Sequence, residues 1–98
     1  MILAGGKERT MVGVAGYEDK QDCKVTVKLK KRGKLNIRLN SKMDKMFGKQ
    51  IIAAAEEELD HLGVKYADVI IDDFNSLDFV IQARIRTAVR RARASENV

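Results

Sequence analysis

KVTVKLKKRGKLNIRLN, residues 24–40, contains two runs in which apolar and polar residues alternate. The first run places valine or leucine at every second position over residues 24–30, and the second does the same with leucine and isoleucine over residues 34–40. A period of two with β-branched residues is typical of half-buried strands. The short KRG segment between the runs supplies Gly33 for a turn. The sequence therefore predicts a β-hairpin here, with one apolar face and one basic face.

Two further segments have the character of strands. MVGVAG, residues 11–16, is short and apolar, and we expect it to be an edge strand that runs into a turn. VKYADVIID, residues 64–72, is the other segment and predicts a fourth strand. Together with the hairpin, these segments predict a mostly antiparallel sheet of three to four strands.

Between residues 41 and 63 the apolar period becomes helical. Ser41 can cap the first amides, Asp44 stands where the acid of a capping box reaches back, and Gly63 can end the helix. The apolar stripe consists of Met43, Phe47, Ile51, Ala54, Ala55, Leu59 and Leu62. We expect a solvated face, or a surface that meets a basic partner, at the acidic residues Glu56, Glu57, Glu58 and Asp60.

A second helical pattern occupies the C-terminal part of the chain. Asn75 with Asp78 resembles a helix cap. The apolar stripe of this helix consists of Leu77, Ile81, Ile85, Ala88, Val89 and Ala92. LDFVIQARI, residues 77–85, also alternates in the manner of a strand, so the sequence leaves two structures open for it.

These elements predict an α+β fold. Each helix has one apolar stripe and the sheet has one apolar face, and these surfaces must bury one another, which gives a two-layer sandwich of order β-β-β-α-β-α. We expect a single domain over residues 11–93, with loose tails over residues 1–10 and 94–98.

Composition places the chain among globular proteins of the cell interior. The 98 residues are 45% hydrophobic and 34% charged, and no apolar run approaches the length of a membrane span. The N-terminal sequence has no stretch suited to a secretory signal, and one cysteine cannot form an internal disulfide. We therefore expect a cytoplasmic protein with no membrane partner.

No catalytic constellation is evident in the sequence, so we expect a chain that is not a catalyst by itself. His61 is the single histidine and is expected to lie on the surface at a helix end. Cys23 begins a strand and is expected to be packed there, not to act as a nucleophile. Asp72, Asp73 and Asp78 lack the other ligands of a calcium loop, so a strand-end turn accounts for them better than a metal site.

The net charge of +5 favours acidic partners and raises an alternative function. A basic sheet face and a basic helix could contact nucleic acid through phosphates. The residues concerned are Lys24, Lys28, Lys30, Lys31, Arg32, Lys34 and Arg38 on the sheet, and Arg84, Arg86, Arg90, Arg91 and Arg93 on the helix. No aromatic residue stands among the outward positions of the hairpin, which disfavours base stacking.

DDFNSLDFVIQARIRTAVRRA, residues 72–92, resembles the C-terminal segment of the citrate lyase acyl carrier protein, or gamma chain. That family is related to the malonate decarboxylase acyl carrier subunit, and its segment reads D-D-K-G-A-L-D-C-x-I-x-A-R-x-x-A-A-x-x-R-A. The matching residues are Asp72, Asp73, Leu77, Asp78, Ile81, Ala83, Arg84, Ala88, Arg91 and Ala92. SKMDKMFG, residues 41–48, is similar to the family's S-S-V-E-K-Q-F-G, and the whole resemblance covers residues 12–92. The departures are Phe74, Asn75 and Ser76, where the family prefers K-G-A.

The resemblance also assigns a role to VAGYEDKQDC, residues 14–23. In the family, the first strand ends in a turn such as A-G-S-L-E-S-S-D, where a serine beside an acid carries phosphoribosyl-dephospho-coenzyme A. Here that serine falls at Lys20, which cannot form the phosphodiester link. The other residues of the implied attachment loop are Gly16, Tyr17, Glu18, Asp19, Gln21 and Asp22.

The resemblance implies a non-catalytic subunit that joins the transferase and lyase subunits of a citrate lyase-type complex. Three roles stay open at this point. The chain is a carrier whose serine was replaced, a paralogue that keeps the docking surfaces as a scaffold, or a relative in fold alone with a separate binding role. A basic nucleic-acid-binding module is the alternative from a different functional class.

Overall fold

The computed structural model of the protein describes residues 11–42 and 44–95. The expected N-terminal tail lies outside the described residues, as does the end of the expected C-terminal tail. The described elements are β1 (Met11–Gly16), β2 (Cys23–Leu29), β3 (Leu35–Ser41), α1 (Asp44–His61), β4 (Ala67–Asp73) and α2 (Asp78–Ser95). Their order confirms the predicted α+β class, and α2 continues through Ser95 into the segment expected to be a tail.

The predicted hairpin is wrong, because the strands of residues 24–40 do not pair with each other. The sheet has the order β1-β2-β4-β3, so β4 lies between β2 and β3. β4 pairs with β2 antiparallel, from Cys23↔Asp73 to Leu29↔Ala67, and with β3 parallel. The sheet is thus mostly antiparallel, as predicted, but β3, α1 and β4 form a parallel β-α-β unit.

The burial of the strands agrees with the central position of β4. On β4, Ala67, Val69 and Ile71 are essentially inaccessible to solvent, whereas the apolar residues of β3 are only partly buried. The strand with the most completely buried side chains gains most from having a neighbour on both sides. The connection over residues 30–34 is also long enough to cross the end of one intervening strand, which is about 10 Å in the sheet direction.

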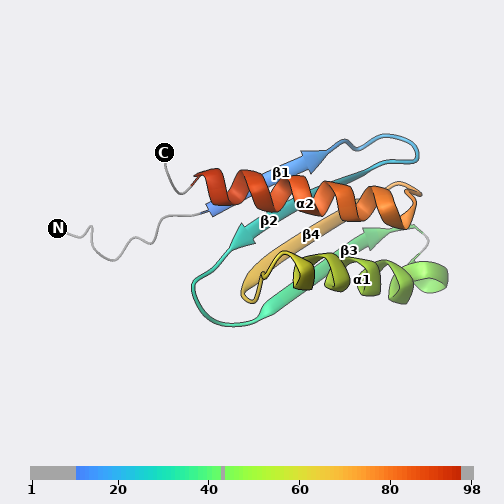
Figure 1. Cartoon of the computed structure of the whole chain (residues 1–98). Coiled ribbons are helices and arrows are strands. Elements are labelled where there is room, and N and C mark those ends of the chain that lie inside the picture. The colour runs from blue at the N-terminus through green and yellow to red at the C-terminus, as the bar shows by residue number, and fades with distance from the viewer. Residues whose placement is uncertain (1–10, 43, 96–98) are drawn as a thin grey trace.

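Both helices cover the same face of the sheet (Figure 1). α2 packs on β1 and β2, α1 packs on β3, and the two helices contact each other. The core forms between these layers from the inward residues of the strands and the helix stripes, including Val25, Val27, Ile51, Leu59, Val69, Ile71, Ile81 and Ile85. The two-layer sandwich is therefore confirmed. Among the described residues, no helix is long and apolar enough to cross a membrane.

The contact between β1 and α2 is unusually close at Gly13. A Cβ atom built on Gly13 would lie 1.9 Å from the Ala88 carbonyl oxygen and 2.5 Å from the Ala92 amide nitrogen. Such distances are far below van der Waals contact, so only glycine allows α2 to approach the strand this closely. The small residues Gly13, Ala88 and Ala92 together set the separation of the two layers at this edge.

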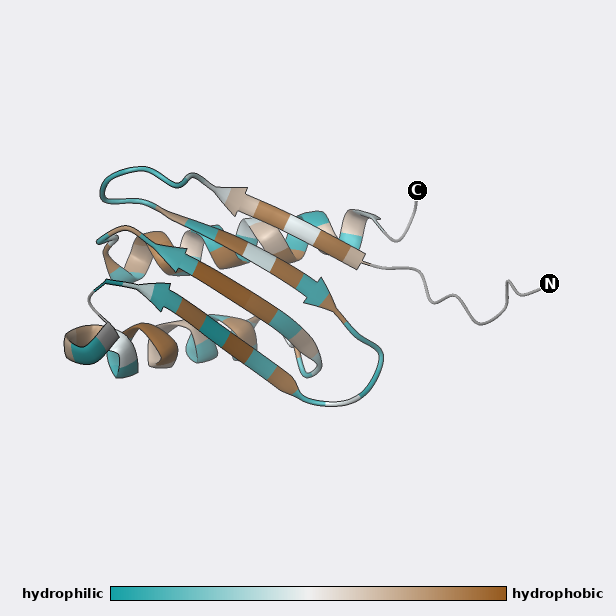
Figure 2. Ribbon diagram, turned by 180° about the vertical axis from the view of Figure 1, so that it is seen from behind, coloured by the Kyte–Doolittle hydropathy of each residue, from teal (hydrophilic) through white to brown (hydrophobic). Residues whose placement is uncertain are grey.

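Figure 2 shows the sheet from its open side, which neither helix covers. The register of the strands shows that this face is not continuously basic. β4 places Asp68 opposite Lys28 and Asp72 opposite Lys24. Each aspartate also accepts a hydrogen bond from an asparagine of β3, Asn36 to Asp68 at 3.1 Å and Asn40 to Asp72 at 2.9 Å. The inserted strand therefore divides the lysines expected to form one phosphate-binding face.

The residues at the two ends of α1 agree only in part with the predicted helix start and stop. Gly63 follows the helix with a φ of +71°, which confirms the predicted stop. Ser41 ends β3, and its hydroxyl donates to Asp73 Oδ2 at 3.2 Å. Met43 and the side chain of Asp44 lie outside the described residues. Phe47, expected in the buried stripe, is 44% exposed.

α2 begins as a helix at Asp78, which excludes the strand reading of residues 77–85. The predicted cap at Asn75 is wrong, because Asn75 adopts a φ of +65° and Asp73 Oδ1 accepts the Ser76 amide at 3.0 Å. Leu77 provides the first carbonyl of the helix and is itself 62% exposed. The remaining apolar residues of the predicted stripe are buried.

Candidate functional site

The β1–β2 loop, residues 17–22, lies at the rim of the sheet and is open to solvent. Residues 17–21 are all exposed, and Asp22 is partly buried where the loop joins β2. Lys20 stands at the far end of the loop, next to Asp19, whose Oδ1 accepts the Lys20 amide at 2.7 Å. The predicted loop residues are therefore brought together on one exposed connection, and none of them is built into a helix.

The base of this loop is tied to the β4–α2 connection. The Gln21 amide donates to the Phe74 carbonyl at 2.7 Å, and the Phe74 amide donates to the Asp22 carbonyl at 2.9 Å. These bonds continue the β2–β4 ladder beyond its last strand pair, Cys23↔Asp73. Gly16 begins the loop at a φ of +93°, where a Cβ would lie 1.8 Å from the Cys23 carbonyl oxygen. The loop thus presents an exposed tip on a fixed base.

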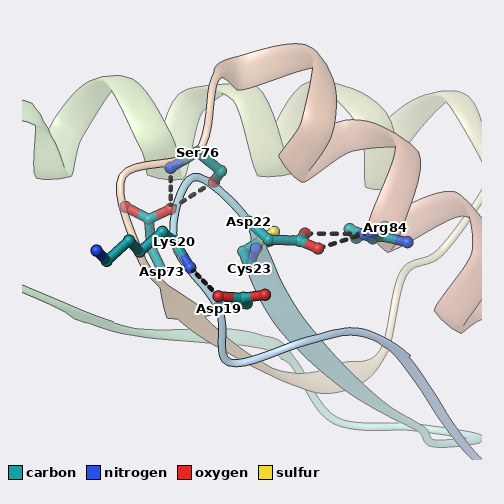
Figure 3. Close-up of polar contacts among 7 residues, drawn as sticks. All are labelled: Asp19, Lys20, Asp22, Cys23, Asp73, Ser76 and Arg84. Carbon is teal, nitrogen blue, oxygen red and sulfur yellow. Dashed lines mark hydrogen bonds and ion pairs between the residues drawn. The ribbon is translucent and has the colours of Figure 1, made fainter.

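Arg84 of α2 fixes the same base through its side chain (Figure 3). Its Nε donates to Asp22 Oδ1 at 3.0 Å and its terminal nitrogen donates to Asp22 Oδ2 at 2.7 Å, a two-point contact that lysine cannot reproduce. The hydrogen bond from Arg84 holds the pKa of the Asp22 carboxyl below its usual range. The Arg84 guanidinium carbon also lies 5.7 Å from the centre of the Tyr17 ring. Sequence reasoning matched Arg84 to a family motif but placed it on a basic helix face and missed this contact.

We expect Asp22→Asn to lower the free energy of unfolding by about 1–2 kcal/mol, since it removes one ionic partner of a partly buried pair. Hydrogen exchange should accelerate at the amides of residues 20–22. Because the folded-state pKa of Asp22 is lowered, the stabilisation is present at neutral pH and declines as the pH falls below about 4.

Arg84→Lys serves as the matched control, since it keeps the charge and loses the two-point geometry. It should recover only part of the stability that Arg84→Ala loses. Unchanged stability and unchanged loop exchange in Asp22→Asn would show that the ion pair does not hold the loop.

A cleft of about 750 Å³ opens beside the loop and is lined by residues 18–21, 40–42 and 72–75. Asp73 closes its base, where its Oδ1 accepts both the amide and the hydroxyl of Ser76. Asp72 also borders the cleft, but its carboxylate lies on the other face of β4, where it accepts a hydrogen bond from Asn40. The alternation of the strand thus separates the adjacent aspartates, and no three potential metal ligands gather within the described residues.

Cys23 is packed beneath the loop, as predicted. Its side chain is fully buried at the start of β2, and burial raises the pKa of its thiol to about 11. A neutral, inaccessible thiol is a poor nucleophile. Cys23 therefore belongs to the support of the loop and does not replace the missing attachment group.

The native protein should resist alkylation of Cys23 at pH 8 and react fully once unfolded by urea, as read by intact mass. Because the folded-state pKa of the thiol is raised, stability should fall as the pH rises from about 9 towards 11, by roughly 2–3 kcal/mol. A Cys23→Ala variant should not show this loss of stability at alkaline pH. Rapid alkylation of the folded wild type would contradict the packed position.

Two other residues singled out from the sequence, His61 and Glu58, belong to α1 and not to the β1–β2 loop. His61 lies exposed at the end of α1. Glu58, expected on a solvated face, is only 6% exposed, and its carboxylate accepts from Arg86 Nε at 3.1 Å and from its terminal nitrogen at 3.3 Å. The helix–helix contact therefore includes an ion pair that neither helix reveals alone.

Comparison with known proteins gives sequence matches that cover most of the chain. The sequence model of a family described as malonate decarboxylase delta subunit (MdcD) matches residues 9–92. The citrate lyase acyl carrier protein of Haemophilus influenzae (strain PittEE) is 43% identical over 83 residues, which cover 85% of each chain. The protein of that name from Streptococcus mutans serotype c is 44% identical over 79 residues, covering 81% of this chain and 78% of the relative. The corresponding protein of Clostridium perfringens is 40% identical over the same shares of each chain.

Proposed function

The chain belongs to the family of the malonate decarboxylase delta subunit (MdcD), and we propose that it serves as the acyl carrier-type subunit of a citrate lyase-type complex in the cytoplasm. The observation that carries this proposal is the exposed β1–β2 loop, held at its base by Arg84 and Phe74. A carrier does little bond-breaking itself. It presents a group to active sites on other subunits, so it needs a reachable loop on a rigid body.

The residues of this loop do not fit a phosphoribosyl-dephospho-coenzyme A group linked as a phosphodiester. Lys20 occupies the attachment position by resemblance, and its amine cannot form that link. The one hydroxyl in the loop belongs to Tyr17, whose ring lies against Arg84 at the base and away from the tip. Gln21 and Cys23 offer no alternative, since one carries an amide and the other is buried. We therefore assign this chain the role of a serine-less scaffold that keeps the docking surfaces of a carrier.

Affinity capture of the tagged chain from its native host tests the proposed complex. We expect lyase and transferase chains to be recovered in stoichiometric amounts and identified by peptide mass spectrometry. A tagged Gly13→Ala variant is the matched control, because a chain in which α2 is forced away from β1 should recover less of both. Recovery of the wild-type chain alone would contradict the proposed function.

A further inference from the structure

Six basic residues gather at the end of the sheet opposite the β1–β2 loop. We call this surface the basic end, and it consists of Lys30, Lys31, Arg32, Lys34, Lys65 and Arg93. Two backbone hydrogen bonds join the connections that carry them: the Lys30 amide donates to the Tyr66 carbonyl at 3.0 Å, and the Ala67 amide donates to the Lys34 carbonyl at 3.1 Å. Figure 1 shows these connections at the far end of β2 and β4 from the loop.

The basic end is hollowed at its centre. Lys30, Lys65 and Arg93 line a depression of about 330 Å³, whose apolar wall includes Met11 and Leu29. Residues from β2, the α1–β4 connection and α2 therefore converge on one concave, positively charged surface. Its members are distant in sequence, which is why the lysine-rich segment of residues 28–34 alone did not predict it.

Most of these charges have no carboxylate partner among residues 11–42 and 44–95. Lys30 is the exception, with Nζ 3.0 Å from Asp68 Oδ1. The Asn36 hydrogen bond, followed by that of Lys30, lowers the pKa of Asp68, so this carboxylate is already engaged. Arg93 donates a hydrogen bond to the Leu62 carbonyl, which is a neutral acceptor. Lys31, Arg32, Lys34 and Lys65 are exposed.

The loop end is organised differently. There, Arg84 is paired with Asp22 at 2.7 Å and Lys24 with Glu18 at 3.5 Å. The sheet face between the two ends also balances its lysines with Asp68 and Asp72. Exposed lysines also occur at the start of α1, but the basic end is distinguished by gathering six cations, of which only Lys30 has a carboxylate partner within the described part of the chain.

We propose that the basic end docks onto an acidic surface of a partner subunit. The inference rests on the proposed function and identifies the surface that such a complex would use. A seven-residue strand separates this end from the β1–β2 loop by about 20 Å, so docking there leaves the loop pointing away from the contact. Unpaired cations that face the carboxylates of a partner accelerate the association of the two proteins and fix their relative orientation. This effect weakens as salt is added.

A protein partner fits this surface better than nucleic acid does. A duplex presents phosphates along an extended line, whereas the basic end is confined to one end of the sheet, and the adjoining face interposes Asp68 and Asp72.

Charge reversal tests the proposal, with the triple variant Lys31→Glu, Arg32→Glu, Lys34→Glu compared against Arg38→Glu, Lys45→Glu, Lys49→Glu. Both variants change the net charge by the same amount at exposed positions. A difference in binding between them therefore reports the location of the charges and not the net charge. The measurement is binding to the isolated lyase and transferase subunits at low and moderate salt. We expect the basic-end variant to lose about tenfold or more in affinity, with a reduced salt dependence, and the control to stay near wild type.

Equal binding by the wild type and the basic-end variant would overturn the inference and leave the proposed function intact. Equal loss in both variants would also overturn it, because overall charge would then be responsible. If the wild type binds neither subunit, the proposed function and the inference fail together. Tight binding of duplex DNA by the wild type, abolished in the basic-end variant, would assign the surface to nucleic acid and overturn the protein partner.

Discussion

A Gly13→Ala substitution is expected to lower the free energy of unfolding by about 3 kcal/mol or more, a large share of the roughly 5–15 kcal/mol that is typical of a folded domain. The added methyl would lie 1.9 Å from the Ala88 carbonyl oxygen and 2.5 Å from the Ala92 amide nitrogen, so two elements would have to separate. Both obstructing atoms belong to the backbone of α2, and no side-chain rotation can relieve the overlap. Urea denaturation followed by circular dichroism measures the effect.

Gly63→Ala provides the control for this change. No heavy atom lies within 4 Å of a Cβ at Gly63, so its cost comes from the φ of +71° alone and should be about 1 kcal/mol. If Gly13→Ala is no more destabilising than Gly63→Ala, α2 does not pack on β1 as closely as described. The position of Arg84 over the loop would then be in doubt as well, since the same helix carries it.

A Lys20→Ser substitution is expected to convert a chain that carries no group into one that is modified on most molecules. The protein would be co-expressed with a separate enzyme able to transfer phosphoribosyl-dephospho-coenzyme A, the group that the resemblance implies, onto a serine hydroxyl. Position 20 is exposed beside Asp19, and its amide is already fixed by that carboxylate. The substitution therefore supplies the missing hydroxyl without altering the base of the loop. Intact mass spectrometry would reveal the added group.

Gln21→Ser is the matched control, one residue further along the same exposed loop. Its φ of +60° directs the side chain differently from that of a neighbour in an ordinary conformation, and it should remain unmodified. Modification of Gln21→Ser but not of Lys20→Ser would show that the attachment position had been misaligned by one residue. Modification of neither would show that the transferase requires contacts that this chain lacks.

The elements themselves could be predicted because their patterns are local. Alternation at Val25 and Val27 indicates a strand, and the spacing of Ile81, Ile85 and Val89 indicates a helix face, whatever lies opposite. The exposure of the β1–β2 loop was also predictable, since its polar residues follow Gly16 at the end of an apolar strand.

Strand order could not be predicted in the same way. Two adjacent alternating runs are equally compatible with a hairpin and with strands separated by a third, and the outcome depends on how completely β4 is buried relative to β3. The pairs Asp22–Arg84 and Glu58–Arg86 join residues far apart in sequence, so each partner alone looked like an ordinary surface charge. The residues of the loop could be named from the sequence. The structure adds the contacts that hold the loop in place.

The mass of the chain isolated from its native host tests the central claim most directly. We expect the mass of the unmodified polypeptide, recovered from a complex that contains lyase and transferase chains. An excess equal to phosphoribosyl-dephospho-coenzyme A, mapped by peptide fragmentation to any residue of the β1–β2 loop, would contradict it, because the chain would then be a working carrier and not a serine-less scaffold.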